Sequence, residues 1–148
     1  MKKRLKILIR YSIYFIIFSF IGSLLEYLFR FVEGTGIAYD KGLYELFNVK
    51  IFFIPFYGLV GLSLIFFDRF LEKKKIKIFY MGILNGLLIV SWEFVGALFS
   101  IVVLGHKVWD YSEHILNFNG MISLQMSFLW ILIGYLFALL YKYIIKKY

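Results

Sequence analysis

The sequence contains no cysteine. Disulfide bonds and thiolate metal sites are therefore excluded, and cysteine usage gives no information about the redox compartment. The sequence also has no Gly-x-x-x-x-Gly-Lys-Ser/Thr motif, so it lacks the loop that binds ATP phosphates in P-loop ATPases. No serine or threonine stands beside a histidine in a nucleophile elbow, which leaves a catalytic triad without support. We expect a protein that is not an enzyme and that holds no cofactor.

Apolar side chains are what the sequence has in abundance. Of the 148 residues, 62% are hydrophobic and 22% are aromatic, whereas a soluble domain is about 45–50% apolar. This composition predicts an integral membrane protein, and the length suits one domain over residues 1–148. The basic start, Met1 to Arg10, is similar to that of a signal peptide. However, the apolar run behind it exceeds the roughly 7–15 residues of a signal core and no small-x-small cleavage site follows, so we expect a retained first span.

Four apolar segments are long enough to cross a bilayer as helices, which takes roughly 20 residues for a core of about 30 Å. They lie at about residues 11–31, 51–67, 78–104 and 121–141. The sequence thus predicts an all-α membrane protein with four transmembrane helices. The only proline, Pro55, falls in the second of them. It is tolerated there if the helix begins close to it, and it kinks the helix if the start lies earlier.

The basic residues predict the orientation. Lys and Arg number 17, against 9 Asp and Glu, for a net charge of +8. Most of them lie before the first span, between the second and third, and after the fourth. The other two connections hold only Lys41, Lys50 and Lys107, with Arg30 at their edge. By the positive-inside rule, both termini are cytoplasmic. The charge is therefore explained by topology and by anionic lipid, and we expect no nucleic-acid partner.

Two carboxylates stand inside the predicted spans. Glu26 lies four residues before Arg30, the spacing of an ordinary ion pair on a helix face, so a structural and a functional role are both open. Glu93 falls near the middle of the membrane, where ionisable groups are rare and face the bundle interior or a wet cavity. No basic residue lies within one turn of Glu93, so its partner comes from another helix or it is protonated. A functional role and a simple interhelical hydrogen bond both remain open for it.

A polar stretch, WDYSEHILNFNGMISLQ at residues 109–125, leads into the fourth span on the predicted outer side. We interpret it as the rim and upper wall of one pocket that opens to the outer face. The predicted pocket residues are Glu26, Glu93, Tyr57, Trp109, Asp110, Tyr111, Asn117, Asn119, Ser123 and Gln125, and the predicted structural residues are Pro55, Gly58, Gly120 and Arg30. A metal site is an alternative, because His106, Asp110 and His114 are each four apart. That spacing aligns ligands only if the loop is helical, and we expect no metal.

Small residues recur at helical spacing in all four spans, which is the usual means of close helix packing in lipid. They include Ser12, Ser19 and Ser23, then Gly58 and Gly61, then Gly82, Gly86, Ala97 and Ser100, and finally Gly120, Ser123, Ser127 and Gly134. The first and third spans also look alike, with FIGSLLEYLF beside IVSWEFVGALF. A parallel two-helix repeat would put Glu26 and Glu93 in equivalent places, as in parallel-repeat transporters.

Several short motifs carry a resemblance to a known family. They are Gly22 to Glu26, PFYG at 55–58, WEF at 92–94, WDYS at 109–112 and NFNGMISL at 117–124. From about Gly22 to Trp130 the chain resembles the CmpB-like bacterial membrane proteins, a family of putative ABC-transporter type IV permeases. The chain departs from the family pattern at Met121, where an arginine is usual, and before Pro55, where most of an Asn-Arg-Gly-Phe stretch is missing. These departures remove cationic groups from the predicted outer pocket.

The resemblance implies a small permease or transporter subunit of the bacterial cytoplasmic membrane. Without a phosphate-binding loop, an ABC-type role requires a separate ATP-binding subunit, docked on the basic connection from Arg69 to Lys77. Four helices are few for a complete pathway, which favours a homo-oligomer. Two other functions stay open. One is a non-catalytic membrane scaffold or binding subunit, and the other is an intramembrane enzyme that uses Glu26 and Glu93 as acid and base on a lipid.

Overall fold

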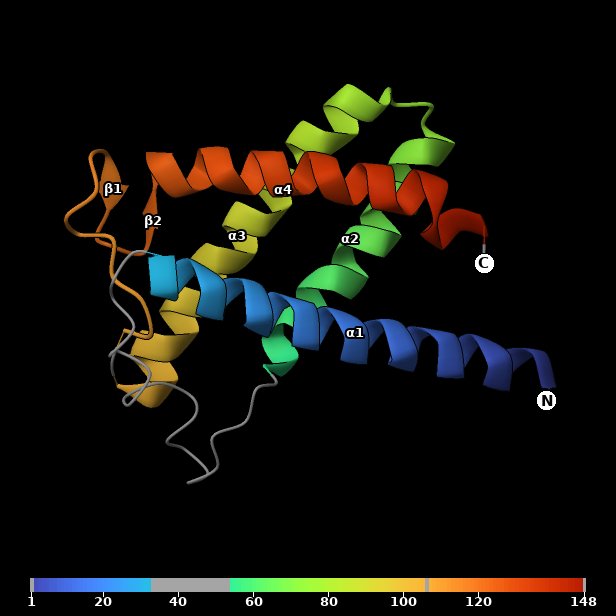
Figure 1. Ribbon diagram of the computed structural model, residues 1–148, viewed down its shortest axis with the longest axis horizontal. Coiled ribbons are helices and arrows are strands. Elements are labelled where there is room, and N and C mark those ends of the chain that lie inside the picture. Colours follow the sequence, from blue (N-terminus) through green and yellow to red (C-terminus); the bar gives the residue numbers. More distant parts are fainter. Residues whose placement is uncertain (1, 33–53, 106, 148) are drawn as a thin grey trace. The chain divides into compact units, whose positions relative to one another are not determined.

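The computed structural model describes residues 2–32, 54–105 and 107–147, with the side chains of residues 2, 26–32 and 104 outside that description. The described residues form four α-helices, a short two-stranded hairpin and one turn of 3-10 helix (Figure 1). The predicted helical class is confirmed, whereas the hairpin was not expected. The chain divides into two units, Met1–Ser63 and Leu64–Tyr148, and each has its own packing.

The first unit contains α1 (Lys2–Val32) and the first half of α2 (Pro55–Lys73). α1 has 31 residues, or about 46 Å of helix at 1.5 Å per residue. It is longer than the predicted span at residues 11–31 because the basic amino-terminal residues join the helix. Within it, Lys3–Leu25 is long and apolar enough to cross a membrane.

Glycines let the two helices of the first unit approach each other closely. A Cβ at Gly58 would overlap the ring of Phe15, and a Cβ at Gly61 would overlap the ring of Phe18. Each glycine of α2 therefore receives an aromatic side chain from α1. The small-residue packing that the sequence predicts is confirmed for this pair of segments.

Two buried serines of α1 contact the start of α2. The Ser23 hydroxyl donates to the Ser19 carbonyl oxygen at 2.6 Å and accepts from the Ile54 backbone N–H at 2.8 Å. Pro55 follows as the first residue of α2, the position at which a proline fits a helix because its missing N–H has no helical partner in any case. Of the two outcomes considered for Pro55, the helix that begins at the proline is the one observed.

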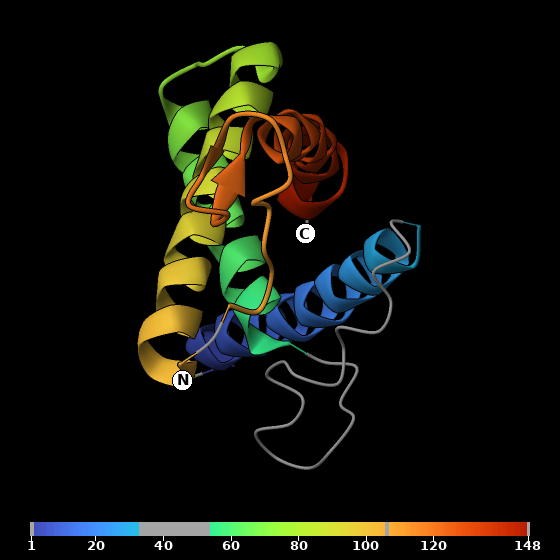
Figure 2. The same cartoon turned by 90° about the vertical axis from the view of Figure 1, so that its left-hand side faces the viewer.

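The second unit contains the rest of α2, α3 (Ile78–Leu104), the hairpin, α4 (Leu124–Tyr143) and the 3-10 turn η3 (Ile145–Lys147). α3 coincides with the predicted span at residues 78–104. Two stretches of this unit, Ile78–Val103 and Leu124–Lys147, are long and apolar enough to cross a membrane. Figures 1 and 2 show α4 crossing α3, with the hairpin at the amino end of α4.

α2 is not among the described helices that are long and apolar enough to cross a membrane. Its apolar part runs from Pro55 to Phe67, which is 13 residues counted inclusively. That is about 20 Å of helix, against a hydrocarbon core of about 30 Å. Charged residues begin immediately afterwards, at Asp68. The expected span at residues 51–67 is therefore not supported by residues 54–73.

A β-hairpin precedes α4. Its strands are β1 (Asn117–Phe118) and β2 (Ile122–Ser123), which pair antiparallel. Asn119, Gly120 and Met121 join them. Asn119 and Gly120 have φ values of 50° and 71°, in the left-handed region that Asn and Gly tolerate best. A backbone hydrogen bond of 2.9 Å closes this turn. The fourth helix was expected to begin at residue 121. It begins at Leu124 instead, because the preceding residues complete the hairpin.

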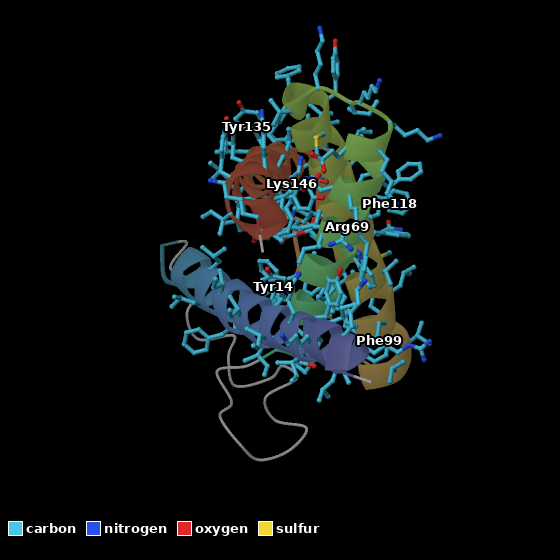
Figure 3. The ribbon with its side chains drawn as sticks, turned by 90° about the vertical axis from the view of Figure 1, so that its right-hand side faces the viewer. Tyr14, Arg69, Phe99, Phe118, Tyr135 and Lys146 are labelled. Atoms are coloured by element: carbon cyan, nitrogen blue, oxygen red, sulfur yellow. The ribbon has the colours of Figure 1, made fainter. Side chains whose placement is uncertain are left out.

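Large apolar side chains are exposed along the two long helices of the second unit. On α4, Phe128, Leu132 and Leu136 are four residues apart and 65%, 56% and 55% exposed. On α3, Phe99 is 51% exposed (Figure 3). Soluble proteins rarely expose contiguous apolar patches of this kind, and these faces are suited to contact lipid.

Candidate functional site

Three glycines bring α3 and α4 into close contact. A Cβ at Gly134 would overlap the backbone nitrogen of Gly86 and the carbonyl oxygen of Gly82, and a Cβ at Gly86 would overlap the backbone of Ile131. Backbone atoms cannot rotate away as side chains do, so only glycine fits at this crossing. Gly82 and Gly86 form the small-x-x-x-small pattern of close helix pairs in membranes. The sequence prediction of close packing is confirmed here as well.

A buried carboxyl–amide pair lies at this crossing. Asn85 of α3 donates from Nδ2 to Oδ1 of Asp68 of α2 at 2.9 Å, and the same nitrogen lies 3.4 Å from the Gly134 carbonyl oxygen of α4. Asp68 and Asn85 are both 0% exposed. Their other oxygens, Asp68 Oδ2 and Asn85 Oδ1, have no hydrogen-bond partner in the part of the chain that the structure describes. Three helices therefore meet at one pair of polar side chains.

The charge of Asp68 is governed by its burial. Burial raises the pKa of Asp68 to about 6, while the hydrogen bond from Asn85 lowers it and the Glu72 carboxylate raises it. Glu72 itself pairs with Lys146 and accepts from the Tyr141 hydroxyl at 3.4 Å. Asp68 therefore titrates much closer to neutral pH than an aspartate in water does.

Glu93 is a second buried carboxylate of the same unit. It is 6% exposed, and the Tyr111 hydroxyl donates to its Oε1 at 2.8 Å. Tyr111 belongs to the loop that follows α3, and its ring stacks on His114 with the centroids 5.1 Å apart. One hydrogen-bond partner of Glu93 is thus a loop tyrosine, whereas the sequence left open a partner on another helix or a protonated Glu93.

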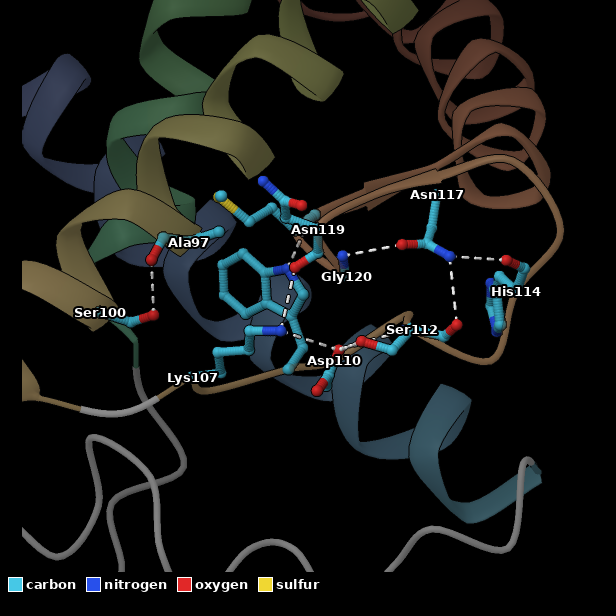
Figure 4. A network of polar contacts seen from close by, with 11 residues as sticks. Ala97, Ser100, Lys107, Asp110, Ser112, His114, Asn117, Asn119 and Gly120 are labelled. Atoms are coloured by element: carbon cyan, nitrogen blue, oxygen red, sulfur yellow. Dashed lines mark hydrogen bonds and ion pairs between the residues drawn. The ribbon is translucent and has the colours of Figure 1, made fainter.

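Asp110 organises the loop between α3 and the hairpin. Its Oδ1 accepts from the Ser112 backbone N–H at 3.0 Å and from the Ser112 hydroxyl, and Lys107 Nζ lies 3.2 Å away (Figure 4). Lys107 also donates to the Asn119 carbonyl oxygen at 2.9 Å. The hydrogen bond from the Ser112 hydroxyl holds the pKa of Asp110 below its ordinary value, and Lys107 adds to this effect. Asp110 is therefore bound to its own loop.

Asn117 connects the loop to the hairpin. Its Nδ2 donates to the carbonyl oxygens of Ser112 and His114 at 3.1 and 2.9 Å, and its Oδ1 accepts from the Gly120 N–H at 2.9 Å (Figure 4). Ser123, which is 2% exposed, has its hydroxyl 3.0 Å from His114 Nδ1 and caps α4 by accepting a backbone N–H of its first turn at 3.3 Å. Asn117 and Ser123 thus bond to groups of the loop, the hairpin and α4.

The remaining predicted pocket residues lie in different places. Trp109 donates from Nε1 to the Met121 carbonyl oxygen at 3.0 Å. The side chains of Asn119 and Gln125 are exposed. Tyr57 belongs to the first unit, where it packs against Gly22 of α1.

Some sequence predictions fall outside the described residues. Glu26 and Arg30 belong to α1, but their side chains are outside the description, and so is His106. The common pocket of Glu26 and Glu93, and the repeat that relates them, therefore stay predictions. Within residues 2–32, 54–105 and 107–147, no group of three His, Asp or Glu side chains is placed to hold a metal ion.

Sequence reasoning did not single out Asp68 or Asn85. Asp68 adjoins Arg69 and the basic connection after α2, so it reads as the end of a span. Asn85 is a lone amide in an apolar helix. One signal was available: Asn85 lies three residues after Gly82, on the helix face that the glycines mark. A polar side chain on a glycine-marked face points to a helix contact, not to lipid.

Comparison with known protein families gives a match. A family model described as putative ABC-transporter type IV matches residues 13–148. No curated protein and no solved structure matches the chain. The matched range includes both buried carboxylates of the second unit, the loop and the hairpin.

Proposed function

The chain belongs to the putative ABC-transporter type IV family, and from this we propose that it is a permease subunit of a membrane transporter. The observation that carries the proposal is Glu93, a carboxylate that is 6% exposed in the middle of a helix long and apolar enough to cross a membrane. Carboxylates at such a depth are costly, and they mark substrate or ion pathways.

In this proposal Glu93 lines the pathway and Tyr111 closes it. The loop that carries Tyr111 is held together by the contacts of Asp110 and Asn117, so Tyr111 leaves Glu93 when the loop moves as a whole. A substrate group that donates a hydrogen bond then takes the place of the Tyr111 hydroxyl on Glu93 Oε1. The connection before α3 is basic, so the positive-inside rule predicts that it lies in the cytoplasm. If α3 then crosses the plasma membrane, the loop that follows α3 lies on the outer face and the pathway opens outward.

The energy source is a separate subunit in this proposal. The 148 residues contain no phosphate-binding loop, so ATP hydrolysis by a P-loop needs a partner. Its docking surface is the end of α2 and the connection to α3, where the lysines at residues 73–75 are exposed. Few spanning helices also mean that a complete pathway needs more than one copy of the chain.

Co-purification tests whether the chain binds a separate ATP-binding subunit. Wild-type protein extracted with mild detergent from its native membrane should retain a stoichiometric ATP-binding subunit, identified by mass spectrometry. Glutamine at residues 73–75 should release that subunit, because the basic surface is lost. Glutamine at the exposed basic residues 3, 4 and 6 removes the same charge elsewhere and should not. A wild-type preparation without any ATP-binding subunit would contradict the ABC-type function.

A transport measurement tests the role of the Glu93 carboxylate. Glu93→Gln removes the charge but keeps an oxygen that accepts from Tyr111, so expression and folding should be preserved while transport is lost. The measurement compares, by mass spectrometry, the solutes that membrane vesicles of the native host accumulate with and without ATP. Glu113→Gln, at an exposed position of the same loop, is the matched control. Wild-type accumulation in Glu93→Gln would rule out a pathway through Glu93.

A second candidate function is a non-catalytic scaffold or binding subunit. It is favoured by the loop, in which Asp110, Asn117 and Ser123 bond to groups of the loop, hairpin and α4, leaving these side chains little capacity for a ligand. In that case a stable complex with a partner should form and survive both Glu26→Gln and Glu93→Gln, with no solute accumulated by the wild type.

A further inference from the structure

We propose that Asp68 and Asn85 form a proton-binding site where α2, α3 and α4 meet. The bound proton sits on Asp68 Oδ2 and is shared with the Asn85 amide oxygen. The site is distinct from Glu93, which lies eight residues after Asn85, or about 12 Å further along α3. Proton binding here does not depend on the proposed transport function, since it is a property of the second unit alone.

One proton would provide the hydrogen bond that the two unpaired oxygens of this pair lack. An ionised carboxylate and an amide oxygen are both acceptors and cannot bond to each other. Asn85 Nδ2 already supplies Asp68 Oδ1 with a donor, which leaves Asp68 Oδ2 and Asn85 Oδ1 as buried acceptors without a donor among the described residues. A proton turns Asp68 Oδ2 into a donor, and Asn85 Oδ1 is the free acceptor on the side chain to which Asp68 is already bonded.

The surroundings favour the neutral form of Asp68. On α2 the Glu72 carboxylate raises the pKa of Asp68. Arg69, the next residue of α2, interacts with the Tyr141 hydroxyl of α4. α3 presents the uncharged Asn85, and α4 presents the Gly134 carbonyl oxygen. The Lys146 ammonium group forms an ion pair with Glu72. Burial of a carboxylate that has no cationic partner among the described residues is unfavourable, and its raised pKa of about 6 reflects this.

Proton release has a mechanical consequence. An ionised Asp68 loses the hydrogen bond from its Oδ2 to the Asn85 amide oxygen and leaves a buried negative charge beside Asn85 Nδ2. Because this pair joins α2 to α3 at the point where α3 crosses α4, deprotonation weakens the attachment of α2. The protonation state of one side chain then controls how firmly three helices are held together.

The sequence makes the test simple, because it contains only three aspartates, Asp40, Asp68 and Asp110. Full-length protein carrying ¹³C-labelled aspartate carboxyl groups is placed in phosphatidylcholine nanodiscs and titrated from about pH 4 to about pH 8, a range above the ordinary aspartate pKa of about 3.9. Infrared spectroscopy follows the labelled carboxylic-acid band. One band should disappear with a midpoint near the pKa of about 6, be missing from Asp68→Asn, and persist in Asp40→Asn and Asp110→Asn.

The outcomes decide the proposal. If all three labelled groups titrate near an ordinary aspartate pKa of about 3.9, the site does not exist. A band near pH 6 that persists in Asp68→Asn also overturns the assignment. The wild-type titration decides the first point even if Asp68→Asn does not fold. In these titrations choline is the cation of the buffer salt, and replacing it with Na⁺ should leave the midpoint unchanged. A midpoint that falls as the Na⁺ concentration rises would show that a metal cation, not a proton, is the ligand of this site.

Discussion

Replacing Gly134 by alanine should separate α3 from α4. The new methyl group would overlap the backbone nitrogen of Gly86 and the carbonyl oxygen of Gly82, and neither atom can move without its helix. The crossing also holds the Gly134 carbonyl oxygen 3.4 Å from Asn85 Nδ2. Separating the helices therefore removes a contact of the buried carboxyl–amide pair together with the glycine packing.

The magnitude follows from two opposing effects. Overpacking a close contact costs about 1–3 kcal/mol, and loss of a weak hydrogen bond adds about 0.5 kcal/mol. Alanine stabilises a helix by about 1 kcal/mol relative to glycine. We therefore expect Gly134→Ala to lower the free energy of unfolding by about 0.5–2.5 kcal/mol. Gly134→Val, which adds a larger side chain at the same place, should lower it further.

Reversible unfolding of the purified protein in mixed micelles with rising denaturing detergent provides the measurement. Leu136→Ala is the matched control on α4, because Leu136 is 55% exposed, and surface changes of this kind usually stay within about 0.5 kcal/mol. If Gly134→Ala is more stable than the wild type, as an ordinary helical glycine replaced by alanine would be, then the close crossing described for α3 and α4 is refuted.

Three further changes probe the loop and the hairpin. Tyr111→Phe leaves the buried Glu93 without its hydroxyl donor and should cost about 1–3 kcal/mol of unfolding free energy; a double-mutant cycle with Glu93→Gln should show coupling, and additive effects would argue against the contact. Ser123→Ala removes the cap of α4 and should speed hydrogen exchange in its first turn, for a loss of about 1 kcal/mol; unchanged exchange would contradict the cap. Because the folded-state pKa of Asp110 is lowered, its stabilising contribution is present above the ordinary pKa and is lost as the pH falls through the folded value. The amide signal of Ser112 in NMR spectra should therefore shift at a lower pH than for an ordinary aspartate, and Asp110→Asn should abolish that shift.

Helix α3 shows which features a sequence can predict. Its apolar run of 27 residues is bounded by Lys77 and by Gly105, so its two ends are marked by local chemistry. Gly105 has a φ of 75°, the left-handed conformation with which helices commonly end at glycine. The same reasoning placed α4 only to within three residues, because it counted the apolar run from Met121 and overlooked Asn119-Gly120 as a turn signal.

Helix α2 shows where counting apolar residues fails. Formation of a helix and crossing of a membrane are separate properties. α2 forms a helix, but its apolar part ends before Asp68 and is too short to cross a membrane. The partner of Asp68 lies 17 residues away on another helix. That partnership depends on how the helices cross, which is a property of three-dimensional packing and leaves no periodic pattern in the sequence.

The sequence singled out several residues of the loop after α3, but not the contacts that they make. Glu93 and Tyr111 were both expected to be pocket residues, and their hydrogen bond joins positions 18 residues apart. It forms because the loop folds back over α3, held by contacts of Asp110 and Asn117 that could not be read from spacing. The pairing of Asp68 with Asn85 was missed for the corresponding reason, since the glycine-marked face of α3 indicates a helix contact at Asn85 but not which residue it meets.

The Asp68–Asn85 contact also bears on how the chain is made. Asn85 leaves the ribosome 17 residues after Asp68, and Gly134 follows 49 residues later. Because synthesis adds about 5–20 residues per second, Asn85 is made on the order of one to three seconds after Asp68. A short apolar helix that ends in a carboxylate is a poor candidate for entering the membrane alone. We expect Asn85 to reach Asp68 while the chain is still being synthesised, and α4 to join α2 and α3 only once its glycine face has been made.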